Sequence, residues 1–205
     1  MARLVLWSGL DSWRAEVVSL DLSADGIVAT GTQMGADPVA YRLDYRLEAG
    51  PAFITQMLTV DVAGETWGRQ LRLVRHADGN WSCDTTERGA APLPPAGGDV
   101  EAVSGALDCD LARSPLTNLM PVRRHHLHER PGEAELLMAW VSVPDLGLRP
   151  SEQRYEHVRR EADHAVVRYV GRNRDFVGDL VVDRDGVVEL YPDLARRVTT
   201  TPGMA

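Results

Sequence analysis

The sequence contains no lysine, so each of its 22 basic residues is an arginine. The acidic residues number 30, which leaves a formal net charge of −8 at pH 7. A nucleic-acid-binding face needs a concentration of positive charge, so this balance argues against a DNA or RNA partner. It argues equally against electrostatic attachment to an anionic bilayer.

Cysteine and long apolar runs are also scarce. Cys83 and Cys109 form neither a C-x-x-C pair nor a disulfide-rich pattern, so we expect two free, buried thiols. The apolar start, Met1 to Leu10, is too short for a signal peptide, and no stretch approaches the roughly 18–20 apolar residues of a membrane span. These absences predict a cytoplasmic protein with no integral membrane segment.

Familiar catalytic and metal-binding motifs are missing as well. The chain has no G-x-S-x-G, no P-loop and no G-x-G-x-x-G. His125, His126 and His128 form the densest histidine cluster, but spacing supplies no further ligand, and Arg123 and Arg124 add positive charge beside it. We therefore expect no catalytic residue, no metal and no cofactor.

Alternation of apolar and polar residues dominates what is present. Arg14–Leu20 and Ile27–Met34 flank Asp25-Gly26, a hairpin signal because type I′ turns need positive φ at both central positions. Tyr41–Leu47 alternates strictly, as a strand with one buried face does. The pattern predicts an all-β, mostly antiparallel fold of about a dozen or more strands with little helix. Further predicted strands are Phe53–Val62, Gln70–Leu73, Glu135–Val143, Ala165–Val170 and Phe176–Val182.

Two segments are less regular. Ser151–Arg160 fits a short helix with Ser151 as its N-cap, but its side chains also alternate, and we predict a strand. Arg88–Gly98 is rich in proline, glycine and alanine and is predicted to be a loop. Because strands are equally dense on both sides of it, we predict a single domain over residues 1–205. Two halves joined by the loop at 88–98 are the alternative.

The most distinctive stretch is Leu107–Arg124, which combines Ser114-Pro115, Thr117-Asn118 and the pair Arg123-Arg124. One interpretation is an ordered loop whose polar side chains satisfy buried backbone groups. The other is a polar rim in which Asn118 and the arginines bind hydroxyls or an anionic head group. Both remain open on the residues alone.

This stretch resembles the signature of a bacterial glycolipid-binding family that was once catalogued as a domain of unknown function. The family pattern reads roughly D-x-D-[LI]-x-x-[ST]-P-x-T-N-T-L-P-[IV]-R-R-L, and the chain departs from it at Leu119-Met120 and His125. Flanking segments resemble the family in the same order. They are Gly79-Asn80-Trp81, Ala139-Trp140-Val141, Gln153-Arg154-Tyr155 and the closing run from Asp183 through Gly186-Val187-Val188 to Tyr191-Pro192.

The resemblance implies a spiral β-roll or half-barrel, similar to the lipoprotein carriers of the bacterial envelope, and a binding function without catalysis. The concave face of an open roll can hold an acyl chain, as lipid-binding barrels do. The expected partner is a lipid or glycolipid, bound by a monomer or homodimer. The residues expected to contact it are Trp81, Asp110, Asn118, Arg123, Arg124 and Tyr155.

Two alternatives belong to other classes of protein. A hydrolase or lyase acting on a related glycolipid would use Asp108, Asp110 or one of the clustered histidines, and needs an acid and a base with separated pKa values. A structural homo-oligomer would instead pair exposed strand edges.

Overall fold

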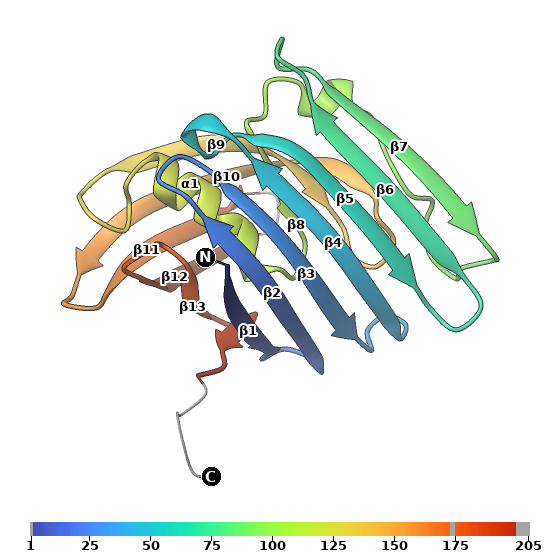
Figure 1. Cartoon of the computed structure of the whole chain (residues 1–205), viewed down its shortest axis with the longest axis horizontal. Coiled ribbons are helices and arrows are strands. Elements are labelled where there is room, and N and C mark those ends of the chain that lie inside the picture. The colour runs from blue at the N-terminus through green and yellow to red at the C-terminus, as the bar shows by residue number, and fades with distance from the viewer. Residues whose placement is uncertain (1, 173–174, 200–205) are drawn as a thin grey trace.

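A computed structural model describes residues 2–172 and 175–199. Within these ranges, fourteen strands form one continuous sheet in the order β7-β6-β5-β4-β3-β2-β1-β14-β13-β12-β11-β10-β9-β8. Neighbouring strands are antiparallel except β8 and β9, which run parallel. The predicted all-β roll is confirmed, and the sheet stays open between its edge strands β7 and β8 (Figure 1).

The strands fall into two groups along the chain. The first group is β1 (Arg3–Gly9), β2 (Arg14–Leu22), β3 (Ile27–Gly35), β4 (Tyr41–Ala49), β5 (Thr55–Ala63), β6 (Gly68–Arg75) and β7 (Trp81–Arg88). The second is β8 (Asp108–Leu111), β9 (Glu133–Val141), β10 (Leu148–Arg160), β11 (His164–Gly171), β12 (Phe176–Asp183), β13 (Val188–Tyr191) and β14 (Ala195–Arg197).

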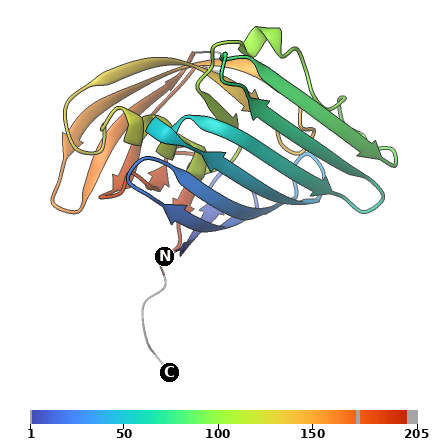
Figure 2. The same ribbon diagram turned by 45° about the horizontal axis from the view of Figure 1, so that its top comes forward.

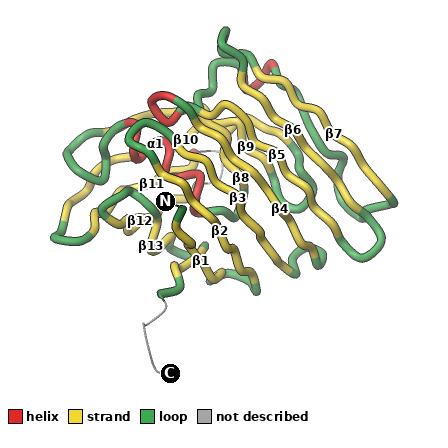
Figure 3. The backbone as a smooth tube through the Cα atoms, in the orientation of Figure 1, coloured by secondary structure: helices red, strands yellow, loops and turns green. Residues whose placement is uncertain are grey.

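Helical segments are short. They are the 3-10 helices η1 (Pro51–Phe53), η2 (Glu101–Val103) and η3 (Pro115–Asn118), and the six-residue α-helix α1 (Leu119–Arg124). No helix in the described ranges has the length and apolarity that a bilayer crossing requires. Figure 3 shows that helices form only a small part of the molecule, which otherwise consists of strands and loops.

Of two local predictions, one is confirmed in full and the other in part. Ser151–Arg160 lies within β10, so the strand interpretation is confirmed. The hairpin at Asp25-Gly26 is also confirmed, but its predicted type I′ turn is wrong because Gly26 does not adopt a positive φ. The Ser23 hydroxyl accepts a hydrogen bond from the Gly26 N–H instead and closes a longer connection.

The sheet curves so that β1–β7 face β8–β12 across a shared interior (Figures 1 and 2). Segments η3 and α1 lie between the two groups of strands and fill this space. Leu116, Leu119 and Met120 are buried there, in one core with the inward side chains of the first seven strands. The concave face that an acyl chain was expected to occupy is therefore covered by the chain's own residues.

The proline-rich connection after β7 is anchored rather than free. The buried Arg69 guanidinium donates hydrogen bonds to the carbonyls of Pro94 and Asp145, at 2.5 and 2.8 Å. Backbone bonds also link Gly97 to Leu146 and Leu148. These bonds hold the predicted loop against the connection between β9 and β10.

Candidate functional site

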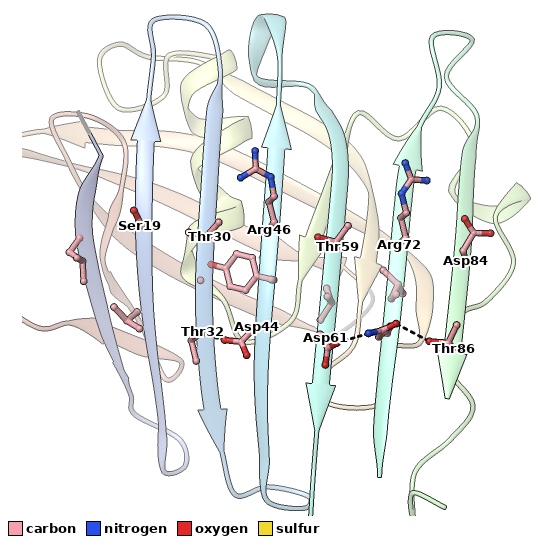
Figure 4. A pocket seen from close by; sticks show the side chains of 17 residues that line it. Ser19, Thr30, Thr32, Asp44, Arg46, Thr59, Asp61, Arg72, Asp84 and Thr86 are labelled. Carbon is pink, nitrogen blue, oxygen red and sulfur yellow. Dashed lines mark hydrogen bonds between the residues drawn. The ribbon is translucent and has the colours of Figure 1, made fainter. Parts of the chain in front are cut away.

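A groove lies on the face of β1–β7 that points away from the core. Alternation along these strands sends one set of side chains inward and leaves the other set on this outer face. The groove has a volume of about 760 Å³ and crosses all seven strands. Figure 4 shows the side chains that line it.

Strand register arranges most of the lining into two rows that run across the sheet, with Gly31, Tyr45, Val60 and Leu71 at inward positions between them. The first row consists of cross-strand neighbours Leu4, Ser19, Thr30, Arg46, Thr59, Arg72 and Asp84. The second row consists of Val17, Thr32, Asp44, Asp61, Gln70 and Thr86. Such rows arise because directly opposite residues share a face and lie close together.

Hydrogen bonds fix the polar part of the second row (Figure 4). Thr32 donates to Asp44 at 2.5 Å. The Gln70 amide donates to Asp61 at 2.6 Å and accepts from Thr86 at 3.2 Å. This part of the groove therefore offers carboxylate and amide groups whose orientation is set before any ligand arrives.

The first row contributes the cationic groups of the groove. Arg46 forms an ion pair with Glu48 at 2.7 Å, and Arg72 lies between Thr59 and Asp84 in the row. Both guanidinium groups point toward the same end of the strands (Figure 4). Guanidinium and carboxylate groups on one surface can donate to and accept from the hydroxyls of a neutral ligand.

The groove becomes apolar toward β1 and β2. Leu4 begins the first row and is 66% exposed, and Val17 begins the second row. Val28 and Met34 add exposed apolar surface to the same face of β3. The groove therefore has a polar end on β4–β7 and an apolar end on β1–β2.

Three of the six residues predicted to bind ligand lie together in the interior. The Tyr155 hydroxyl bonds to the side-chain oxygens of Asn118 and Gln153, at 2.9 and 3.0 Å. Gln153 donates to Asp110 at 2.7 Å, and Asp110 also accepts from Thr117 at 2.8 Å. This network joins β8, η3 and β10 through side chains that are mostly buried.

The two arginines of the signature also have protein partners. Arg124 makes a bidentate ion pair with Asp108, whose side chain is fully buried. Burial raises the pKa of Asp108 more than Arg124 lowers it. Arg123 lies over the Phe53 ring at 5.2 Å and donates to His128 at 3.2 Å.

Trp81, the sixth predicted residue, is buried and donates its indole N–H to the carbonyl of Ala106 at 3.2 Å. None of the six is among the residues that line the outer groove. Their role in ligand binding stays a prediction.

The side chains proposed for catalysis contact different protein partners. Asp108 and Asp110 are engaged as described above, whereas His126 contacts Glu129 at 3.2 Å. Burial, with nearby Arg124, lowers the pKa of His125, and burial also lowers the pKa of His128. In the described ranges, no three histidine, cysteine or acidic side chains converge as a metal site would require.

Fold and groove together define an open β-roll that carries a ligand-sized, amphipathic surface groove. Residues 4–197 match the model of the family described as "Putative glycolipid-binding", and the chain belongs to this family. A solved structure of a DUF1089 family protein from Pseudomonas aeruginosa is similar, with 28% identity and a TM-score of 0.66. The similarity covers 89% of this chain and 92% of that one. No curated protein matches the chain.

Proposed function

We propose that this protein binds a glycolipid in the outer groove of β1–β7 without catalysing a reaction. The observation that carries the proposal is the change in the groove from an apolar end at Leu4 and Val17 to a polar end at Arg72 and Asp84. A glycolipid has the same division between an acyl chain and a hydroxyl-rich head group. The family description supports a binding role of this kind.

The charges of the polar end favour a neutral head group. Three carboxylates, Asp44, Asp61 and Asp84, outnumber the two guanidinium groups of Arg46 and Arg72 in the lining. An anionic head group would meet net repulsion there, whereas sugar hydroxyls can donate to carboxylates and accept from guanidinium groups. We therefore place the sugar on β4–β7.

The absence of catalysis is part of the proposal. Asp44 and Asp61 are fixed by Thr32 and Gln70, which suits carboxylates that hold a ligand in place. We also retain the cytoplasm as the proposed location, which fractionation of cells expressing the tagged chain would test.

Titration with three amphiphiles that share an octyl tail tests the ligand class. We expect octyl glucoside, below its micelle concentration, to shift amide NMR signals of β1–β7. Octyl sulfate and octyl phosphocholine should bind at least tenfold more weakly. Equal binding of all three would show that the polar rows do not recognise the head group and would overturn the sugar assignment.

A substitution at the apolar end tests the groove itself. We expect Leu4→Asp to weaken octyl glucoside binding by about tenfold, because burying a leucine contributes about 1.5 kcal/mol or more. Val177→Asp is the matched control, since Val177 is a similarly exposed apolar residue on β12. If Arg123→Ala abolishes binding while Leu4→Asp binds as the parent does, the ligand is bound by the interior residues of the signature instead.

A further inference from the structure

A second cluster of polar side chains is buried on the opposite face of the same sheet. It is built on the inward positions of β2, β3 and β4, near the ends of these strands where the β1–β2 and β3–β4 connections lie. Its central residues are Glu16 and Gln33, which are cross-strand neighbours and are both buried. Polar side chains are rarely placed in a core without hydrogen-bond partners.

One oxygen of Glu16 is well satisfied and the other is not. The Tyr45 and Ser114 hydroxyls both donate to Glu16 Oε1, each at 2.6 Å. Glu16 Oε2 is buried without a partner. Burial raises the pKa of Glu16 to about 7, although these hydroxyls, Arg14 and the nearby Gln33 amide act to lower it.

Further groups around Glu16 also lack partners. Both polar atoms of the Gln33 side chain are buried without a partner at hydrogen-bonding geometry, although the amide is close enough to influence Glu16. The Tyr41 hydroxyl and Arg113 Nη1 are likewise buried and unpartnered. Arg113 directly precedes Ser114, whose hydroxyl donates to Glu16, and its ion pair with Asp37 places it beside the loop that leads to Tyr41.

Glycines make room for the cluster. A Cβ atom at Gly31 would lie 2.4 Å from the Tyr45 ring, and one at Gly35 would lie 2.7 Å from the Tyr41 ring. The two rings can therefore lie across β3, on either side of Gln33. This placement lets the Tyr45 hydroxyl reach across β3 to Glu16 on β2.

The cluster reaches the surface at Arg113. This side chain is 21% exposed and forms an ion pair with Asp37 at 2.9 Å, which connects the β8–η3 turn with the β3–β4 loop. Arg113 itself adopts a positive φ of 66°, an uncommon conformation for a residue other than glycine. A small molecule could reach Tyr41 and Gln33 by displacing this one exposed ion pair.

The unpartnered atoms limit the chemistry of an occupant. Gln33 and Tyr41 supply donors and acceptors, Glu16 Oε2 supplies an acceptor when ionised, and Arg113 Nη1 supplies a donor. An anion would meet the ionised Glu16 carboxylate, and a cation would meet Arg113 and Arg14. Adjacent hydroxyls each donate and accept, so they can satisfy such a mixed set.

We propose that Glu16, Gln33, Tyr41 and Arg113 form a second binding site, for a small neutral polyol. The number of unpartnered atoms exceeds the roughly three hydrogen bonds that one buried water makes. The site is distinct from the outer groove, since none of its four residues lines that groove.

The side-chain amide of Gln33 reports on this site directly. In an NMR titration of the full chain with glycerol, we expect its NH₂ signals to shift and saturate, while those of Gln56, an exposed residue of β5 outside the groove lining, stay fixed. Gln33→Met should weaken glycerol binding by about five- to tenfold, the effect of losing one or two hydrogen bonds. Gln56→Met is the matched control and should stay within twofold.

The same titration with octyl glucoside identifies the source of the polyol. If Gln33→Met weakens the binding of glycerol alone, the ligand is a free polyol. If it weakens the binding of both probes equally, a sugar head group enters this site. The proposal is overturned if neither probe shifts the Gln33 signals, because the cluster then holds only water. Failure here with Leu4→Asp still effective would leave the groove proposal intact.

Discussion

The buried carboxyl group of Glu16 should make the stability of this protein fall as the pH rises. Tyr45 and Ser114 hold one of its oxygens, yet burial outweighs these bonds and its pKa rises from 4.5 to about 7. Between these values the folded chain keeps a proton that the unfolded chain has released. Proton linkage then requires the free energy of unfolding to decrease across this pH range.

The size of the effect follows from the shift. The contribution is complete below pH 4.5, declines as the pH approaches 7, and is lost above the folded pKa. A shift of about 2.5 pH units corresponds to about 3 kcal/mol. Arg14, Ser114, Tyr45 and Gln33 all favour the ionised form, and their effects are already included in this value.

Glu16→Gln should remove this dependence. Its amide oxygen can still accept from Tyr45 and Ser114, and its NH₂ replaces the unpartnered Oε2 near the Gln33 side chain. We expect the variant to gain stability over the parent between pH 5 and 8, by up to about 3 kcal/mol, in urea unfolding at fixed ionic strength. The other titrating groups, such as His128 with its lowered pKa, are common to both chains and cancel in the difference.

Parallel stability curves for the two proteins from pH 5 to 8 would refute this reasoning, because Glu16 would then titrate as it does in the unfolded chain. Glu48→Gln is the matched control. Glu48 lies on the outer face of β4, so its substitution makes the same chemical change outside the core, and the gain in stability seen for Glu16→Gln should be absent.

Two further substitutions test the packing of the interior by urea unfolding. Arg124→Met leaves the buried Asp108 without its partner and should lower the free energy of unfolding by about 3–5 kcal/mol. The double variant Asp108→Asn/Arg124→Met should recover more than half of this loss, and an equal loss in both variants would contradict the ion-pair argument. Gly31→Val places side-chain atoms where the Tyr45 ring lies and should cost about 1–3 kcal/mol, whereas Thr30→Val on the outer face should change stability by less than 1 kcal/mol. A tolerated Gly31→Val would mean that the ring can move aside.

Strands were predictable because their signal is local. In Tyr41–Leu47 the alternation is visible within seven residues, and β4 contains it whole. The pairing of β1 with β14 is different, since it joins Trp7 to Arg197, which lie near opposite ends of the sequence. Closure of that pair depends on how the whole sheet curves, and no short pattern carries this information.

The six-residue helix α1 shows a second limit. Leu119–Arg124 is too short for a helical period to appear, and it was part of a stretch predicted as a loop or polar rim. Its burial between the two groups of strands fixes it instead. Tertiary packing often determines short helices in this way, because isolated turns of helix are unstable in water.

The candidate sites were hidden from the sequence for opposite reasons. Groove residues such as Thr59 and Arg72 are ordinary polar positions of alternating strands, and only register aligns them in one row. Glu16 and Gln33 would be expected on exposed positions, as glutamate and glutamine usually are. In β2 and β3 both occur at inward positions, and this departure from the pattern is the one signal that could have revealed the buried cluster.

The two candidate sites lie on opposite faces of one sheet and are connected through Tyr45. Tyr45 and Gly31 are part of the groove lining, while the Tyr45 hydroxyl holds Glu16 on the inner side. If a ligand at one site shifts Tyr45, binding at the two sites is coupled, and each ligand then changes the affinity of the other by the same factor. A substitution of Tyr45 would therefore disturb both sites and could assign neither. Leu4 contributes to the groove alone and Gln33 to the buried cluster alone, so variants at these two positions can separate the sites.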